Sequence, residues 1–317
     1  MQVYLDNAAT TPLDERVLKK MLPYFKEKCG NASSLHQEGQ EARFAIEKAR
    51  EIIARSIKAK PKEIIFTSGG TESNNLIIKG LAYSYPEKKH IITSKIEHEC
   101  VLNACKWMES RGYKITYLDV DSEGFINLEQ LEKEIKKDTL LVSIIHGNNE
   151  IGTIQDLKEI GKICKEKNVF FHTDACQSYT KTFLDVKKQN LDSVTLNAHK
   201  IHGPKGVGAL YLKEGIKITP LQHGGGHERN RRSGTENVPG IVGLGKACEI
   251  AIRKIPQEIE RMKKLSDRLS KGIRREIDEV IFNGHPEERV PGILNVCIKY
   301  VEGETMLINL DLEGIYV

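Results

Sequence analysis

The sequence lacks the features that mark several broad classes of protein. No apolar run approaches the ~20 residues that a membrane-spanning helix needs. The first residues, MQVYLDNAATTP, contain neither the charged nor the apolar region of a signal peptide. The chain has no basic tail and no interleaving of aromatic and basic residues, and its net charge is only +4. We therefore expect neither a membrane nor a nucleic acid among its partners.

Cysteines are too few and too irregularly spaced for a disulfide framework. There are seven, an odd number, and no CxxC pair. We therefore expect free thiols and a cytoplasmic location. The candidate metal ligands are His98, Cys100, Cys105 and the pair His223 and His227, and they form no closed four-ligand set. We expect no metal site.

What the sequence does contain is a regular alternation of helical and strand-like segments. Its 317 residues are 39% hydrophobic, which is enough for a substantial core. Seven short apolar runs separate the helical patterns and are typical of strands covered on both faces. These runs are 63–68, 90–94, 114–118, 140–145, 169–173, 193–197 and 208–212. The predicted fold is α/β, with a mainly parallel seven-stranded sheet covered by helices, and with a smaller α+β domain.

One long apolar stripe predicts the boundary between two domains. It runs from Leu244 to Ile273, and Pro256 interrupts it, so we expect a kinked helix that joins the domains. The predicted large domain is 13–254, and the small domain combines 1–12 with 255–317. The final residues, GIYV, look like a strand just beginning, so we expect this small domain to be incomplete at its C-terminal end.

Reactive side chains follow five of the predicted strands, where open α/β sheets bind their ligands. TSGGTES, which opens a helix, places Thr71 and free N–H groups suited to a phosphate. The other strand ends supply an imidazole, amides, a carboxylate and an amine. They place His98, Asn148 and Asn149, Asp174 and Gln177, and Lys200. Each has a simpler explanation alone, such as a helix cap or a surface turn, but their gathering at one sheet edge indicates a site.

Pyridoxal phosphate is the cofactor that calls for this set of groups. It needs a lysine for its aldehyde, an acid facing its pyridine nitrogen and a cup for its phosphate. Lys200 supplies the amine, Asp174 the acid and the 66–75 region the cup. Gly203 to Gly206 allow the backbone to pass close to the cofactor.

Eight ordered segments carry a specific resemblance. The chain resembles the NifS/IscS-type cysteine desulfurases, fold-type I pyridoxal-phosphate enzymes of the class V aminotransferase group. The matching segments are YLDNAATTP (4–12), GNASSLH (30–36), FTSGGTESNN (66–75), EHEC (97–100), GNNEIG (147–152), HTDACQS (172–178), NAHKIHGPKGVG (197–208) and GGGHERNRRSGTENV (224–238).

The resemblance implies a role for each site residue. Lys200 forms the Schiff base, Asp174 pairs with the pyridinium nitrogen and His98 stacks on the ring. Asn149 and Gln177 contact the ring oxygen, and Thr71 and His199 hold the phosphate. Thr235 reaches the phosphate of a partner subunit, which implies a homodimer. Asn197 stands where relatives often carry a phosphate-binding serine, so this chain departs from the family there.

The implied reaction converts L-cysteine to L-alanine and transfers the sulfur as an enzyme persulfide. The sulfur would then pass to an iron–sulfur scaffold or another acceptor protein. Lys200 and His98 would be the catalytic residues, and the accepting cysteine is expected beyond residue 317. Cys176, beside Asp174, is expected to be a packing residue instead. The alternatives are another class V enzyme, such as a selenocysteine lyase, kynureninase or aminotransferase, and a truncated non-catalytic relative.

Overall fold

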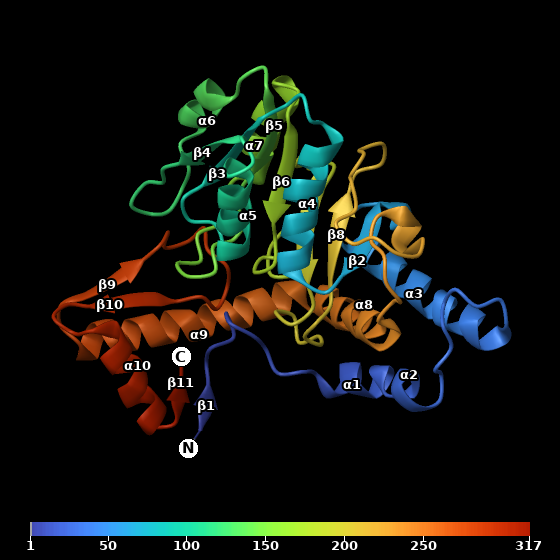
Figure 1. Cartoon of the computed structure of the whole chain (residues 1–317). Helices are drawn as coiled ribbons and strands as arrows, with labels where there is room; N and C mark the ends of the chain where they lie inside the picture. Colours follow the sequence, from blue (N-terminus) through green and yellow to red (C-terminus); the bar gives the residue numbers. More distant parts are fainter. Residues whose placement is uncertain (1) are drawn as a thin grey trace.

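A seven-stranded sheet forms the centre of the molecule (Figure 1). The computed structural model describes residues 2–317. The order of the strands is β2-β8-β7-β6-β5-β3-β4, and β8 alone runs in the direction opposite to the other six. Their bounds are β2 Ile64–Thr67, β3 His90–Ser94, β4 Lys114–Leu118, β5 Thr139–Ser143, β6 Phe170–Asp174, β7 Ser193–Asn197 and β8 Gly208–Leu212. The prediction of a mainly parallel α/β sheet is confirmed.

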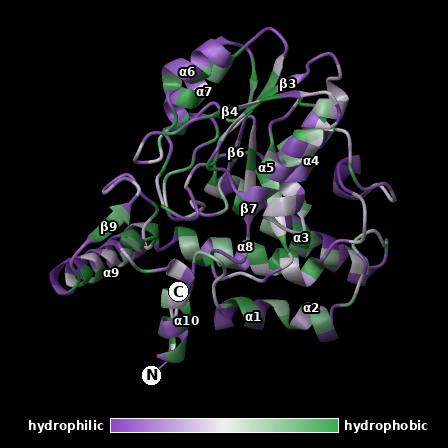
Figure 2. Ribbon diagram, turned by 60° about the vertical axis from the view of Figure 1, so that its left-hand side comes forward, coloured by the Kyte–Doolittle hydropathy of each residue, from purple (hydrophilic) through white to green (hydrophobic). Residues whose placement is uncertain are grey.

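Helices cover both faces of this sheet because its strands are apolar on both sides. Strands β2, β3, β5, β7 and β8 are buried along their whole length. One core joins α3 (Gln37–Ser56), α7 (Leu157–Glu166) and α8 (Val238–Ile252) to the sheet, and the other joins α4 (Gly70–Ser84) and α5 (Glu99–Glu109). Figure 2 shows the hydrophobic colouring along the strands and the mixed colouring of the covering helices. The shorter α1 (Glu15–Met21), α2 (Pro23–Lys26) and α6 (Leu128–Glu134) complete this part of the molecule.

The predicted kinked helix is in fact two helices. Helix α8 ends at Ile252, and α9 runs from Ile255 to Glu276. Pro256 lies in the first turn of α9, where a helix needs no N–H donor and where the fixed φ of proline is favourable. The proline therefore starts a new helix instead of bending an existing one.

The last part of the chain packs beside the first few residues. Strands β9 (Val280–Asn283) and β10 (Asn295–Ile298) form an antiparallel pair, followed by α10 (Gly303–Leu312). Strand β11 (Ile315–Tyr316) pairs in parallel with β1 (Val3–Tyr4). The division into a large domain, 13–254, and a small domain, 1–12 with 255–317, stays a prediction. Within residues 2–317, none of the helices is long and apolar enough to cross a bilayer.

Candidate active site

The carboxyl ends of the parallel strands meet around one cavity of about 450 Å³. Strands β2, β3, β5, β6 and β7 all point to this edge, and the predicted site residues follow them directly. The N-terminal segment crosses the same opening. The lining residues are Asp6, Ala8, Ala9, Gly70, Thr71, His98, Cys100, Ile145, Asn149, Asp174, Cys176, Gln177, Asn197, His199 and Lys200. Every residue to which the resemblance gives a role, except Thr235, therefore lies in this one cavity. Asn148, also named at a strand end, does not line it, and its amide holds the backbone of Ile96, Glu150 and Ile151.

Lys200 lies in the turn that follows β7, and its amine faces the N-terminal segment. Its Nζ donates to the backbone carbonyls of Ala8 and Ala9, the latter at 2.8 Å. Burial lowers the pKa of this amine, while Cys176, Asp6 and Asp174 partly oppose the shift. The neutral, nucleophilic form of Lys200 is thus more accessible than that of a solvent-exposed lysine.

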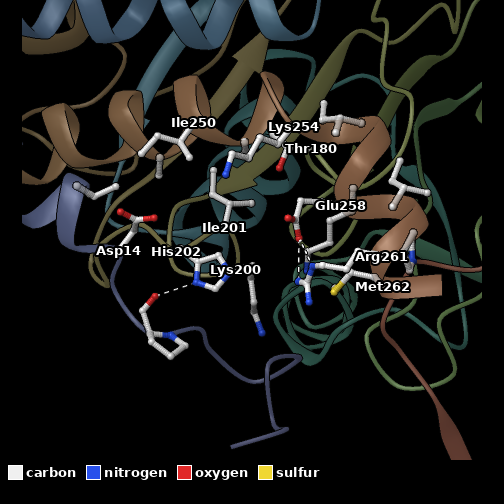
Figure 3. Close-up of a pocket in the computed structure, with 18 of the residues that line it drawn as sticks. Asp14, Thr180, Lys200, Ile201, His202, Ile250, Lys254, Glu258, Arg261 and Met262 are labelled. Carbon is white, nitrogen blue, oxygen red and sulfur yellow. Dashed lines mark hydrogen bonds and ion pairs between the residues drawn. The ribbon is translucent and has the colours of Figure 1, made fainter. Parts of the chain in front are cut away.

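Lys200 also lines a second cavity, of about 400 Å³, between α1 and the start of α9. Figure 3 shows Ile250 and Met262 on the helical side of this space, and Ile201 and His202 beside the lysine. Lys181 lies at the same wall, and its pKa is lowered to about 8, first by burial and second by the charge of Lys200. The wall between the two cavities therefore carries two amines with lowered pKa values.

Asp174, the last residue of β6, presents a buried carboxylate at the opposite wall. It is 4% exposed. Its Oδ2 accepts a hydrogen bond from Asn74 Nδ2 at 2.6 Å, and its Oδ1 accepts one from the backbone N–H of Cys176 at 2.9 Å. These two hydrogen bonds hold the carboxylate in a fixed position. The segment that directly follows β6 is a turn, so Asp174 caps no helix there.

The start of α4 supplies the expected anion-binding end of the cavity. Gly69 precedes the helix with φ of 153°, a conformation that only glycine adopts readily, and no side chain caps the helix. The first N–H groups and Thr71 therefore remain oriented toward the opening. His199 Nε2 lies 3.2 Å from Asn197 Nδ2, and His199 Nδ1 lies 3.2 Å from Thr10 Oγ1.

The imidazole of His199 is neutral at pH 7. Burial lowers its pKa to about 4, and the nearby charge of Lys200 adds to the shift. Without a bound anion, this side chain is therefore a neutral hydrogen-bonding group at this end of the cavity. Asn197 Oδ1 is buried without a hydrogen-bond partner within residues 2–317, so the site retains polar capacity at this end.

His98 and Gln177 are held by contacts that leave one face of each side chain toward the cavity. His98 caps α5, and its Nδ1 accepts from the backbone N–H of Cys100 at 3.1 Å. Gln177 Nε2 donates to the Ala8 carbonyl at 2.6 Å, and Lys181 Nζ lies 3.4 Å from Gln177 Oε1.

Thr235 lies apart from the other site residues. It lines a separate cavity of about 740 Å³ together with Arg50, His227 and Glu228. It contributes nothing to the cavity around Lys200 of its own chain. The expectation that it serves a partner subunit is compatible with this position and stays a prediction.

Several residues of the site were given no role in the sequence analysis. Asp6, Ala8 and Ala9 belong to YLDNAATTP (4–12), which carries part of the resemblance but follows none of the seven predicted strands. Asn74 lies in FTSGGTESNN but inside the helix. The rule that ligands bind at strand ends did not identify these residues. Asp6, Ala8 and Ala9 come from a segment distant in sequence, and Asn74 lies one helical turn beyond the strand end.

Within residues 2–317, no group of three or more His, Cys, Asp or Glu side chains is placed to hold a metal ion.

The donor set fits pyridoxal phosphate. An amine with a lowered pKa, a buried carboxylate and an open helix N-terminus line one cavity. The unpartnered Asn197 oxygen adds a polar group that a ligand would satisfy. Gly70 allows the start of α4 to pack closely against Cys176, since a Cβ at this position would lie only 2.7 Å from Cys176 Sγ.

The chain is similar to proteins that carry the desulfurase name. It is 53% identical over 317 residues to "Cysteine desulfurase IscS" of Dictyoglomus turgidum, covering 100% of this chain and 80% of that one. It is 50% identical over 315 residues to the protein of the same name from Methanosarcina thermophila, covering 99% of this chain and 78% of that one.

Solved structures agree. One described as "NIFS-LIKE PROTEIN" matches with a TM-score of 0.97 and 43% identity, covering 100% of this chain and 87% of that one. One described as "SspA in complex with cysteine" matches with a TM-score of 0.86 and 40% identity, covering 99% and 87%. The model of the family "Aminotransferase class-V" matches residues 3–317. The chain therefore belongs to the class V aminotransferase family.

Proposed function

We propose that this protein is a pyridoxal-phosphate-dependent cysteine desulfurase that converts L-cysteine to L-alanine and passes on the sulfur. The observation that carries the proposal is one cavity in which an amine, a carboxylate and a helix N-terminus converge. The full-length similarity to proteins named cysteine desulfurase IscS supports the reaction class. A neighbour described as a complex with cysteine supports cysteine as the substrate.

When bound, pyridoxal phosphate supplies an aldehyde that captures amines and a protonated ring that accepts the electron pair released at the substrate Cα. The residues of this chain have distinct tasks around it. Lys200 would hold the aldehyde carbon and, once displaced by the substrate amine, move the Cα proton as a base and then as an acid. Asp174 would keep the ring nitrogen protonated. Thr71, His199, Asn197 and the N–H groups of α4 would hold the phosphate.

His98, Asn149 and Gln177 would orient the ring and the substrate. His98 lies at the cavity wall as the cap of α5, where its imidazole can lie over the ring and exchange a proton with groups above it. Gln177 would contact the ring oxygen while its Nε2 holds the Ala8 carbonyl. The same carbonyl accepts from Lys200, so the N-terminal segment, the lysine and the glutamine form one connected unit.

The sulfur-accepting thiol is not one of the cavity cysteines. Burial raises the pKa of Cys100 to about 12 and raises that of Cys176 well above its ordinary value. Neither thiol is set up to become the thiolate that attacks sulfur. This supports the expectation that another segment supplies the accepting cysteine.

We further propose a cytoplasmic homodimer that supplies an iron–sulfur scaffold or another sulfur-acceptor protein. Large apolar side chains lie exposed on α2, on α3 and on the segment between them. They include Phe25, Leu35 and Phe44, which are 61%, 85% and 71% exposed. Burying them against a second copy would be favourable. Thr235 would then reach the partner's phosphate site.

The covalent role of Lys200 is tested by borohydride reduction of the purified, yellow holoprotein. Reduction should fix the cofactor to the peptide that contains Lys200. Lys205, five residues along the chain, is the matched control and should stay unlabelled. Labelling of Lys205 or of the half-buried Lys181 in place of Lys200 would contradict the assignment.

The shared site is tested with two inactive variants. Lys200→Ala and Thr235→Ala should each lose most activity alone. Mixed and refolded together, they should regain part of it, because a hybrid dimer contains one intact site. A monomer by sedimentation that binds cofactor tightly would contradict the dimer, as would mixtures that stay inactive.

A further inference from the structure

Asn74 lies directly behind the carboxylate that we assign to the ring nitrogen. It is a residue of α4, one turn inside the helix, and is 0% exposed. Its Nδ2 lies 2.6 Å from Asp174 Oδ2 and 3.0 Å from Cys100 Sγ. Both amide hydrogens are thus directed to partners at the cavity wall.

The orientation of this amide is determined by its neighbours. Turning it over would bring Asn74 Oδ1 within 2.6 Å of an Asp174 oxygen and place two acceptors against each other. In the observed orientation Oδ1 is buried and has no hydrogen-bond partner within residues 2–317. An unpartnered buried acceptor costs stability, so the fold keeps this amide in place in spite of that cost.

The contacts connect two site residues that lie on different elements. Cys100 Sγ lies 3.1 Å from His98 Nδ1 and 3.0 Å from Asn74 Nδ2, so a continuous chain of polar contacts runs from His98 to Asp174. Asn74 links Cys100 to the Asp174 carboxylate in this chain, and its 2.6 Å hydrogen bond is a short, direct contact with that carboxylate.

We propose that Asn74 is a positioning residue that keeps the proton of the Asp174–cofactor pair on the ring nitrogen. The inference rests on the proposed function, in which Asp174 faces that nitrogen. An N–H donor stabilises the carboxylate but not the carboxylic acid. Without the Asn74 amide, the carboxylate is a stronger base, and the shared proton moves from the ring nitrogen toward Asp174.

The matched control is the next residue of the same helix. Asn75 Nδ2 donates to the Thr71 carbonyl at 2.9 Å and makes no contact with Asp174. Asn75→Ala removes an amide of the same size from α4 without changing the carboxylate's surroundings. Asn74→Leu removes the donor and keeps the branching at Cγ with a somewhat larger side chain, and Asn74→Ala provides a second variant if leucine is not accommodated.

The test is nitrogen-15 NMR of each holoprotein reconstituted with pyridoxal phosphate labelled at the ring nitrogen. We expect the resonance at the pyridinium position in the original protein and in Asn75→Ala. In Asn74→Leu and Asn74→Ala we expect a clear displacement toward the unprotonated position. A merely structural role for Asn74 would change stability or occupancy but would leave the resonance of bound cofactor unchanged.

The possible failures are distinguishable. Bound cofactor that stays fully protonated in either Asn74 variant overturns the role of Asn74 and leaves the proposed function intact. An unprotonated ring in the original protein overturns the pairing with Asp174 and this inference with it. An original protein that binds no cofactor overturns the proposed function itself.

Discussion

The segment that carries His227 to Asn230 is anchored by a buried ion pair, and breaking that pair should be costly. Arg50 Nη1 and Nη2 donate to Glu228 Oε2 and Oε1 at 2.7 and 2.8 Å. The two side chains are only 4% and 3% exposed. Glu228 Oε2 also accepts from the backbone N–H of Phe66 at 2.9 Å, so this carboxylate links α3, β2 and the 227–230 segment.

The expected cost of Glu228→Gln follows from these contacts. Removing one partner of a buried pair leaves an uncompensated charge and typically costs about 3–5 kcal/mol. Glu47 remains 3.0 Å from Arg50 Nε but is 42% exposed, so it compensates only in part. We therefore expect a loss at the lower end, about 3 kcal/mol, which is a large share of the ~5–15 kcal/mol of a folded domain.

The assay is denaturant unfolding followed by far-ultraviolet circular dichroism. Glu260→Gln is the matched control, because the Glu260–Lys264 pair has a similar distance, 2.6 Å, but exposures of 67% and 74%. That substitution should change the free energy of unfolding by no more than about 0.5 kcal/mol. Combining Glu228→Gln with Arg50→Met should cost less than the sum of the two single substitutions, by up to about 3 kcal/mol. A loss below about 1 kcal/mol for Glu228→Gln would refute the reasoning.

Three further predictions follow from the site. Asp174→Asn should retain cofactor but lose activity by orders of magnitude, and near-normal turnover would reduce Asp174 to a residue that only holds the turn after β6. Burial raises the pKa of Glu97 to about 8 from an ordinary 4.5, so the native protein loses stability as pH rises between these values. Glu97→Gln, which has no such ionisation, should gain stability relative to the original protein by up to about 1.4 kcal/mol per pH unit between about pH 6 and 8. A stability difference independent of pH would argue against this. A thiol reagent should modify the exposed Cys29 and Cys297 first and the buried Cys105 only on unfolding, and early loss of the Cys105 thiol would contradict its burial.

Much of the architecture could be predicted from local sequence pattern. The seven strand positions follow from short apolar runs, since a strand buried on both faces must be apolar along its length. Lys200, Asp174 and His98 could be located because each directly follows such a run, and parallel strands place their carboxyl ends at one edge. The cofactor class could then be named from the chemistry of the collected side chains.

The prediction from sequence pattern was wrong where one residue is compatible with two local structures. Pro256 interrupts an apolar stripe, and a proline can either bend a helix or start one. The choice depends on which backbone N–H groups lack partners, and here the preceding helix already ends at Ile252. Strand β9 was not predicted from the sequence. It has only four residues and none of them is fully buried, so it lacks the continuous apolar run that marks the strands of the central sheet.

The sequence by itself determined which residues form the central sheet and which reactive side chains follow its strands, because both depend on periodicity along the chain. Only the tertiary structure decided that the carbonyls of Ala8 and Ala9 meet Lys200, some 190 residues away. It also decided that Asn74 holds Asp174, and that His199 is neutral. These properties depend on which distant segments share a buried, poorly solvated space, and no local pattern records the distance or the desolvation that such packing creates.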